Sequence, residues 1–305
     1  MSGNGLLVYD SSGAAGQNQL VWMDRGGKRL ATVGEPGNVF VPSLSPDGKR
    51  VVVATRDAQK QTSDLWLHDL ARGIATRFTF DPRDDTYPVW SPDGSHIAFG
   101  SDREGSMDLY QKRASGAGQE ELLLKSDTRK FPTDWSSDGR FLLYIEVDPK
   151  TKHDLWVLPM EGDRKPVAVI KTQFAERGGA FSPDGRWIAY ISDESGRFEI
   201  YVQPYPTTGA KWQVSKNGGH WPHWRRDGKE LFWLELDGTM MAAGVSAGQT
   251  FQAEIATPLF KTGLTEIADR YSVSPDGQRF LLRMPVETGS RSVTVVQNWL
   301  AGAQR

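Results

Sequence analysis

Carboxylates are the side chains of this sequence that recur most regularly, and each stands in the same kind of short motif. Asp93 lies in Ser-Pro-Asp-Gly at residues 91–94, and closely similar tetrapeptides return every 43 to 49 residues. An aspartate at this place in a turn accepts hydrogen bonds from its own backbone, so we expect a structural role and no ion binding. The same role is expected for Asp47, Asp138, Asp184, Asp227 and Asp276.

Two further turns, at residues 101–105 and 192–196, are acidic enough to raise the question of calcium binding. Their spacing does not match the Asp-x-Asp-x-Asp-Gly loop with a distal glutamate. Hairpin turns with a glycine in the left-handed conformation explain them better.

His220 and His223 are the only histidines close together, and they are the best candidates for a metal site. Side chains three positions apart on a strand point to opposite faces, and two ligands do not complete a metal site. The sequence therefore predicts no metal and no cofactor.

The nucleophiles of common hydrolases are also missing from the sequence. There is no cysteine, which excludes disulfides and thiolate chemistry. No Gly-x-Ser-x-Gly elbow occurs, so a serine-peptidase function is excluded for this polypeptide. We expect a protein without catalysis of its own.

The turns that carry the aspartates divide the chain into repeats, of which residues 86–125 are a clear example. Short apolar segments at 87–91, 96–100, 108–111 and 120–124 alternate with turns rich in Gly, Pro, Ser and Asp. Four antiparallel strands joined by tight turns are typical of a β-propeller blade, and the fixed period supports this. We predict an all-β, six-bladed propeller closed by both termini, with seven blades, two of them incomplete, as the alternative. The aromatic residues that recur with the repeats are expected to fill the core between blades.

Each end of the chain supplies an incomplete set of strands. We expect residues 29–33 to pair with residues 292–297 and to complete the last blade. Residues 1–24 would then form an extra N-terminal hairpin, and residues 25–305 a single propeller.

The four strands of a blade are named A to D from the inside of the ring outward. The D-to-A loops and the starts of the A strands meet on one face, where charges of both signs lie among aromatic residues. This mixture suits a protein or peptide ligand better than a phosphate backbone. The predicted ligand-binding residues are Asp85, Tyr87, Lys130, Phe131, Glu176, Arg177, His220, Trp221, Asp269 and Arg270.

Repeats of Trp-Ser-Pro-Asp-Gly, an apolar strand, Ser-Asp, Gly and Asp-Leu-Tyr resemble those of the TolB family of the periplasmic Tol–Pal system. Residues 19–25, 77–81, 131–135 and 293–299 are more similar to TolB-like propellers at the C-terminus of bacterial, notably acidobacterial, serine/threonine kinases. The resemblance implies a non-catalytic binding or sensing module for a protein or peptide. The kinase motifs themselves do not occur in the chain. The alternative is a propeller enzyme resembling a metal-dependent lyase, with its site at the channel mouth.

The charge balance limits the possible partners. With 36 basic and 38 acidic residues the net charge is −2, which gives no electrostatic attraction to nucleic acid or an anionic membrane. Apolar runs are only of strand length, so no membrane insertion is expected. We also expect the protein to be a monomer. The first twenty residues show no signal peptide. The chain as given is therefore expected in the cytoplasm, or outside it if it is a fragment of a larger membrane-anchored protein.

Overall fold

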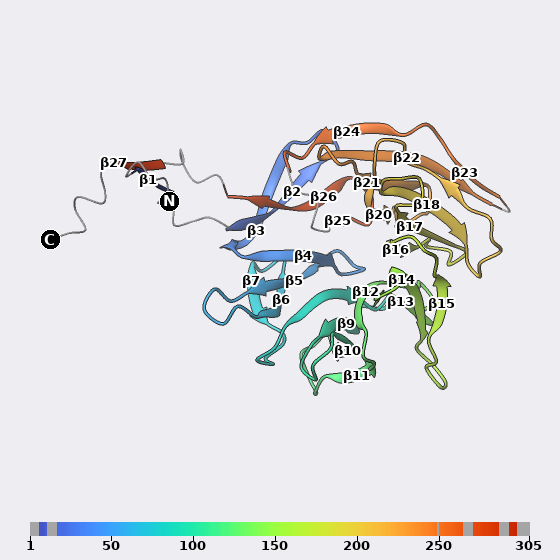
Figure 1. Cartoon of the computed structure of the whole chain (residues 1–305), viewed down its shortest axis with the longest axis horizontal. Helices are drawn as coiled ribbons and strands as arrows, with labels where there is room; N and C mark the ends of the chain where they lie inside the picture. The colour runs from blue at the N-terminus through green and yellow to red at the C-terminus, as the bar shows by residue number, and fades with distance from the viewer. Residues whose placement is uncertain (1–5, 11–16, 249, 265–270, 287–292, 298–305) are drawn as a thin grey trace.

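The structure is a ring of six antiparallel sheets around a central channel (Figure 1). This computed structural model describes residues 6–10, 17–248, 250–264, 271–286 and 293–297. These residues contain strands and turns and no helix, so the predicted all-β, six-bladed propeller is confirmed. Accordingly, the described part of the chain has no helix with the length and hydropathy of a membrane span.

Consecutive strands build five of the blades, numbered I to V along the chain. In blade V the long C strand pairs with two strands, the D strand along its first half and an additional strand, β23 (Phe251–Ala253), along its second half. The bounds are, for blade I, β4 (Val39–Leu44), β5 (Arg50–Arg56), β6 (Ser63–Asp69) and β7 (Ile74–Arg77); for blade II, β8 (Asp85–Trp90), β9 (His96–Ser101), β10 (Asp108–Arg113) and β11 (Glu121–Leu124); for blade III, β12 (Arg129–Trp135), β13 (Phe141–Asp148), β14 (Lys152–Pro159) and β15 (Val167–Ile170); for blade IV, β16 (Glu176–Phe181), β17 (Trp187–Ser192), β18 (Glu199–Pro204) and β19 (Trp212–Gln213); and for blade V, β20 (His220–Trp224), β21 (Glu230–Leu234), β22 (Thr239–Ala247) and β24 (Thr257–Lys261).

Both ends of the chain build blade VI, with two strands each. β25 (Ser272–Val273) and β26 (Arg279–Pro285) are its A and B strands, and β2 (Asn18–Asp24) and β3 (Arg29–Gly37) are its C and D strands. Closure by strands from both termini is therefore confirmed. The predicted partner of the D strand was wrong, because β3 pairs with β2 and not with residues 292–297.

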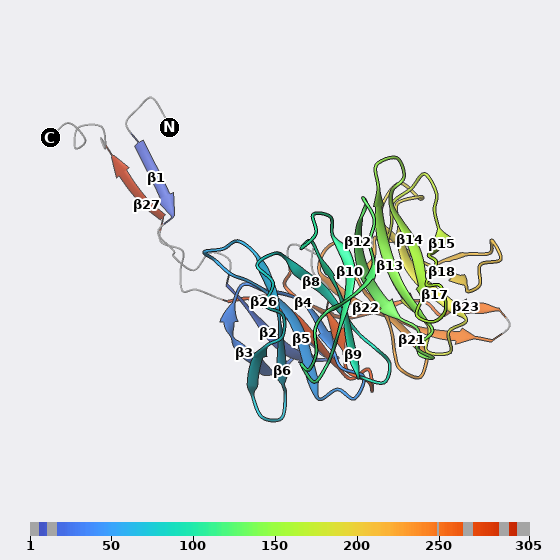
Figure 2. The same cartoon turned by 90° about the horizontal axis from the view of Figure 1, so that it is seen from below.

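The strand β2 consequently belongs to the ring and not to an N-terminal hairpin, which moves the predicted boundary at residue 24 toward the N-terminus. The reason lies in its consecutive apolar residues Leu20, Val21, Trp22 and Met23, which are 1–6% exposed. A strand that is apolar on both faces needs a place between two packed layers, which a blade provides and a surface hairpin does not. The remaining terminal strands, β1 (Leu6–Asp10) and β27 (Val293–Gln297), form a separate two-stranded sheet outside the blades (Figure 2).

Ionic and apolar contacts fasten the closing blade to blade V. Arg25, between β2 and β3, donates to both carboxylate oxygens of Glu230 at 2.9 and 3.1 Å and to the carbonyl of Gly277 at 3.1 Å. Below this ion pair the rings of Phe232 and Phe280 meet edge to face, with their centroids 5.3 Å apart. The ion pair thus joins the N-terminal part of blade VI to blade V, and the phenyl rings pack its C-terminal part against the same blade.

Large side chains fill the wedges between neighbouring blades, as predicted from the recurring aromatic residues. Trp22, Tyr110 and Tyr201, which occupy equivalent C-strand positions, are only 4–6% exposed. The A-strand aromatics Trp90 and Phe181 are each 5% exposed. These members of the periodic set are therefore blade core, whereas Trp66, Trp135, Trp156 and Trp224 are half-buried and pack against the core clusters.

The A-to-B turns repeat one pattern of hydrogen bonds. In blade II the Ser91 hydroxyl donates to Asp93 at 2.6 Å, and the Ser95 amide donates to the same carboxylate at 3.0 Å. The hydrogen bond from Ser91 leads the effects that lower the pKa of Asp93 to about 2. Gly94 follows with φ of 69°, a conformation that glycine adopts without strain. The same serine-to-aspartate bond joins Ser45 to Asp47, Ser136 to Asp138, Ser182 to Asp184 and Ser274 to Asp276, which confirms the predicted structural role.

Candidate functional site

The channel has two structurally different ends. The D-to-A end carries the loops that lead into the A strands together with the B-to-C loops. The A-to-B end carries the A-to-B turns. The sequence predicted the ligand site at the D-to-A end, and the residues named for it fall into three groups.

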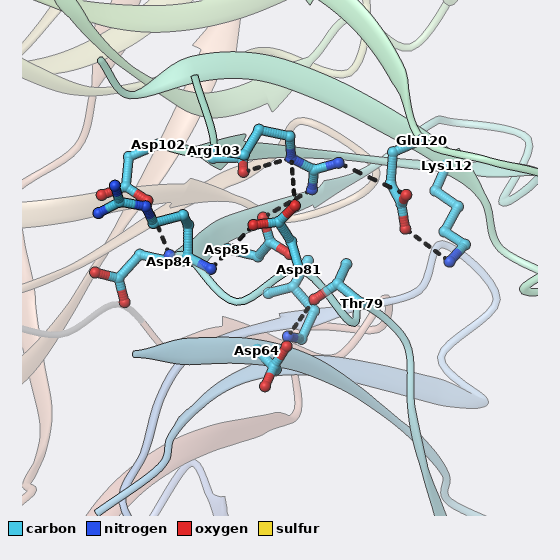
Figure 3. Close-up of polar contacts among 12 residues, drawn as sticks. Asp64, Thr79, Asp81, Asp84, Asp85, Asp102, Arg103, Lys112 and Glu120 are labelled. Carbon is cyan, nitrogen blue, oxygen red and sulfur yellow. Dashed lines mark hydrogen bonds and ion pairs between the residues drawn. The ribbon is translucent and has the colours of Figure 1, made fainter. Parts of the chain in front are cut away.

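Asp85 begins the A strand of blade II, but its side chain is 0% exposed. Arg103, from the B-to-C loop, donates to Asp85 at 3.0 Å and lies 3.8 Å from Asp81 and 3.6 Å from Glu120 (Figure 3). Burial raises the pKa of Asp85 to about 6, although the hydrogen bonds from Ser101 and Arg103 lower it. Asp85 therefore anchors the loop that carries Arg103 and does not face a ligand.

Lys130 holds the equivalent position in blade III and is also 0% exposed. Its ammonium group lies 3.1 Å from Asp108, the first residue of the C strand of blade II, and donates to the carbonyl of Thr128 at 2.7 Å. Both side chains of the ion pair are only 1% exposed. This pair fastens blade III to blade II.

Glu176 holds the equivalent position in blade IV, with 1% exposure. The Thr172 hydroxyl donates to its Oε1, whereas Oε2 has no hydrogen-bond partner among the described residues. Burial raises the pKa of Glu176 to about 7, and the nearby carboxylates of Asp154 and Asp193 act in the same direction.

These three residues belong to a wider pattern of buried charge at the D-to-A end. Blades I to IV each carry, among the first three residues of the C strand, a carboxylate whose side chain is at most 14% exposed. Each of these carboxylates is neutralised or hydrogen-bonded locally. The pairs are Asp64 with Arg77 at 2.7 Å, Asp108 with Lys130 at 3.1 Å, Asp154 with Thr151 at 2.7 Å and Glu199 with Arg197 at 2.7 Å.

The aromatic and cationic residues predicted for this end pack against one another. The rings of Tyr87 and Phe131 lie 4.8 Å apart, and the Arg177 guanidinium lies 4.9 Å from the ring of Phe198. His220 contacts the same phenyl ring at 5.7 Å. Burial lowers the pKa of both Arg177 and His220.

The structure places three of the ten residues predicted for the D-to-A mouth in the interior. Asp85, Lys130 and Glu176 are buried and cannot line an open surface. Asp269 and Arg270 lie outside the described residues. The charges at the strand starts were predicted to face a ligand, but Asp85 and Lys130 have internal partners of opposite charge.

A backbone conformation with positive φ recurs in the A strands, at the inside of the ring. Val41, Tyr87, Gly178 and Trp221 have φ angles of 50°, 54°, 58° and 56°, each next to a shift in strand register. A positive φ at a bulky residue is unusual and often marks a functional site. Here the positive φ recurs at the same place in four blades, so we interpret it as part of the fold. It marks a β-bulge that bends the A strand.

An open cavity occupies the channel from these bulges to the A-to-B end. It has a volume of about 410 Å³, in the range of ligand sites, and residues of all six blades line it. Two indole N–H groups in its wall donate to neighbouring blades, Trp90 to the carbonyl of Ser43 at 2.9 Å and Trp224 to that of Ala180 at 3.2 Å. The aromatic rings in the wall are Trp90, Trp135, Phe181, Trp221, Trp224 and Tyr271.

The rim of this cavity is formed by the second residue of every A-to-B turn. We call this ring the collar; its members are Pro46, Pro92, Ser137, Pro183, Arg226 and Pro275. In most blades the turn glycine packs against the collar proline of the preceding blade, as Gly94 does against Pro46 and Gly48 against Pro275. Sequence reasoning missed the collar because it assigned the Ser-Pro-Asp-Gly motif to the fold alone. The available signal was blade V, where the motif reads Arg225-Arg226-Asp227-Gly228.

His220 and His223 point to different neighbours, as expected for residues three apart on a strand. His220 contacts Phe198 in blade IV, whereas His223 lies 4.7 Å from Tyr271, next to the A strand of blade VI. The two rings therefore do not converge on one ion. In the described ranges of the chain, no three His, Cys, Asp or Glu side chains are grouped as metal ligands.

Comparison with known proteins supports the assignment of the fold. A family model described as the TolB beta propeller domain matches residues 14–165. The uncharacterized peptidase YuxL of Bacillus subtilis is 24% identical in a 211-residue alignment that covers 54% of this chain and 32% of that protein. The uncharacterized protein Atu1656 of Agrobacterium fabrum is 29% identical over 175 residues, or 54% of this chain and 58% of that protein. The chain thus spans less than two thirds of the length of these curated relatives.

Solved structures are similar over a larger part of the chain. A structure assigned as TolB from Agrobacterium tumefaciens has a TM-score of 0.71 at 17% identity and covers 89% of this chain and 99% of its own. TolB from Acinetobacter baumannii has a TM-score of 0.60 at 17% identity, over 93% of this chain and 66% of its own. At this identity the likeness concerns the fold and not the function. Together with the six closed blades, these matches show a six-bladed β-propeller whose residues 14–165 are similar to the TolB beta propeller domain.

Proposed function

We propose that this propeller is a non-catalytic module that binds a peptide segment of a partner protein at the A-to-B end of its channel. The observation that carries the proposal is the open cavity of about 410 Å³ inside the collar. At the opposite end the charged residues Asp85, Lys130 and Glu176 are buried against internal partners. A ligand arriving from solvent therefore reaches an open cavity at the A-to-B end.

The lining suits a peptide because it combines apolar surface with hydrogen-bonding groups. Aromatic rings and prolines can bury an apolar side chain, which supplies most of the affinity in a small protein contact. The Ser43 hydroxyl can donate or accept a bond to a peptide backbone, and the Ser137 hydroxyl, which donates to the carbonyl of Pro183 at 2.7 Å, can still accept one. Phosphate groups would need a concentration of basic side chains, whereas Arg226 is the only Lys or Arg among the described lining residues.

The chain's place within a larger protein is a further part of the proposal. The repeats that resemble the C-terminal propellers of bacterial kinases support a role as the sensing domain of such a protein. In that arrangement the propeller lies outside the cytoplasm and its partner is an extracytoplasmic protein or peptide.

A propeller that belongs to an enzyme is the second candidate, and the similarity to a peptidase of Bacillus subtilis favours it. In that case the cavity admits peptides toward a catalytic domain elsewhere in the protein. Both candidates place a peptide in the channel. They differ in whether the full-length protein cleaves the peptide, and mass spectrometry of a peptide incubated for several hours with the full-length protein would distinguish them.

The site can be tested by blocking one end of the channel at a time. Peptides are selected on the wild-type propeller by phage display, synthesised, and measured by titration calorimetry. Ser137→Trp places a large ring on the exposed collar, and Arg83→Trp places the same ring on an exposed loop at the D-to-A end. We expect Ser137→Trp to weaken binding at least tenfold and Arg83→Trp to leave it unchanged, with both thermal midpoints close to that of the wild type. The reverse result would return the site to the D-to-A end, and failure to select any peptide would overturn the proposal.

A further inference from the structure

Arg226 is the one exception in charge among the residues that form the collar. Four other turns have a proline at this position (Pro46, Pro92, Pro183 and Pro275), and blade III has Ser137. A proline here presets the backbone of the turn and adds apolar surface to the rim. Blade V has Arg226 at this position, so its turn lacks both the restricted backbone and the apolar surface and has a guanidinium group instead.

The side chain of Arg226 extends across the cavity mouth. Its Nη1 donates to the carbonyl of Pro46 at 3.1 Å, so the side chain reaches from blade V past blade VI to blade I. Gly277, the turn glycine of blade VI, packs against Arg225 and not against residue 226. Arg225 thus takes over the packing role of the missing proline, and Arg226 is left to extend over the mouth.

The charge of Arg226 is not neutralised by a carboxylate among the described residues, which distinguishes it from the other arginines of these turns. Arg140 and Arg186 are paired with the aspartates of their own turns, and Arg225 with Asp227 and Glu230. Arg226 instead bonds a neutral carbonyl while its side chain remains exposed.

The cavity wall offers no competing carboxylate at the rim. The one Asp or Glu among the described lining residues is Asp134, in the A strand of blade III. Asp134 already accepts the backbone N–H of Phe181 at 2.7 Å. A ligand anion at the collar therefore meets a positive charge first.

We propose that the collar selects peptides with a carboxylate next to an apolar side chain, and that Arg226 is the residue that recognises the carboxylate. This inference rests on the peptide-binding function proposed above and adds the chemistry of the ligand. A charge-assisted bond to a carboxylate is roughly twice as strong as a bond to a neutral carbonyl, so a ligand carboxylate displaces the carbonyl of Pro46. The prolines and tryptophans beside Arg226 bury the neighbouring apolar side chain and lower the local dielectric, which strengthens the ion pair.

The probes are pools of fluorescein-labelled, C-terminally amidated heptapeptides Gly-Ser-X-Z-X-Ser-Gly, where X is an equimolar mixture of Leu, Phe, Trp and Pro. Position Z is Glu, Gln or Lys in three separate pools. A fourth pool with Z as Gln and a free C-terminal carboxylate distinguishes a side-chain source of the anion from a terminal one. Binding to the full chain is measured by fluorescence anisotropy at 50 mM and 500 mM NaCl.

The variants are chosen to distinguish an effect on folding from an effect on carboxylate recognition. Arg226→Pro restores the residue of the other turns, Arg226→Gln removes only the charge, and Arg140→Gln removes an exposed arginine of the same face that does not line the cavity. We expect one of the two carboxylate pools to bind about tenfold more tightly than the amidated Gln pool, with the preference lost at high salt. Arg226→Pro and Arg226→Gln should abolish the preference, and Arg140→Gln should preserve it.

The possible failures are distinguishable. Equal binding of all pools, or a preference that survives Arg226→Gln, would overturn the role of Arg226 while the peptide-binding function stands. Preference for the Lys pool would overturn the proposed ligand charge and point to Asp134. Absence of binding by every pool, with peptides selected on the same protein also failing to bind, would overturn the peptide-binding function itself.

Discussion

The two ends of the channel use charged residues in opposite ways. At the D-to-A end carboxylates and cations are buried in pairs, such as Asp108 with Lys130, each 1% exposed. At the A-to-B end the charged side chains are exposed on the turns, and an open cavity lies between them. The D-to-A end therefore buries charge to hold the blades in register. The A-to-B end leaves a cavity open, and its ion pair between blades V and VI, Arg25 with Glu230, is only half-buried.

This difference follows from the geometry of the loops. A B-to-C loop folds back over the adjoining D-to-A loop, so polar groups there lose water and must find partners within the protein. An A-to-B turn of four residues satisfies its own polar groups, as the Ser91 and Asp93 bonds show. The side chains of its second residue that do reach another blade, Ser137 and Arg226, bond neutral carbonyl groups and not buried charges. A residue such as Arg226 can change at this end without leaving a buried group unpaired.

The largest effect is expected from breaking the buried ion pair at the D-to-A end. Lys130→Met leaves Asp108 without its cation and should lower the free energy of unfolding by about 3–5 kcal/mol, measured by urea denaturation. The double variant Lys130→Met with Asp108→Leu removes the stranded charge and should recover most of the loss. A loss below about 1 kcal/mol in the single variant would show that this end does not depend on buried charge.

A pH-dependent effect is expected from Glu176, whose pKa is raised to about 7. Because the folded state keeps its proton to a higher pH than the unfolded state, Glu176 destabilises the fold as the pH rises from about 5 to 8. Glu176→Gln should therefore gain stability relative to the wild type over this range, by about 1–3 kcal/mol at pH 8.

The difference between the two proteins is the quantity to measure, by urea denaturation at a series of pH values. Burial lowers the pKa of His68, His153 and His220, and these histidines add stability with rising pH in both proteins. Their contribution cancels in the difference. A difference that stays constant from pH 5 to 8 would mean that Glu176 is not protonated in the folded protein, and that this end tolerates a buried unpaired charge.

The sequence predicted the fold well because its signals are local and repeated. Each Asp-Gly turn specifies its own geometry, and the recurring aromatics mark the faces that must be buried. The period of the repeat indicates how many such units there are. Closure by both termini followed from the incomplete strand sets. The pairing of β3 with β2 was missed because two terminal segments of similar apolar character competed for one position.

The site was harder to predict because it depends on which distant residues meet. Lys130 and Asp108 are 22 residues apart, and nothing in either segment distinguishes a buried partner from a solvated charge. The cavity was missed for the opposite reason. Most of its rim consists of turn prolines. Their role in the turn explains their presence in the sequence, so nothing pointed to the channel that they surround.

A moderate effect is expected at the A-to-B end from removing one turn aspartate. Asp93→Ala deletes the bonds from Ser91 and Ser95 and should cost about 1–2 kcal/mol of folding free energy. Binding of selected peptides should not change, because Asp93 is not among the residues that line the cavity. Loss of binding in a variant with a normal thermal midpoint would show that the turn carboxylates take part in recognition.

The smallest effect is expected from Arg226→Pro, and it tests the comparison most directly. Proline fits the same turn position in four other blades, so the backbone should accept it without strain. The variant loses one exposed hydrogen bond to the carbonyl of Pro46 and gains a more restricted unfolded chain. We expect the free energy of unfolding to change by less than about 0.5 kcal/mol, as for most exposed charges. A loss of more than about 1 kcal/mol would make Arg226 a structural bridge between blades V and I. In that case both ends of the channel would use charge for folding, and the contrast between them would disappear.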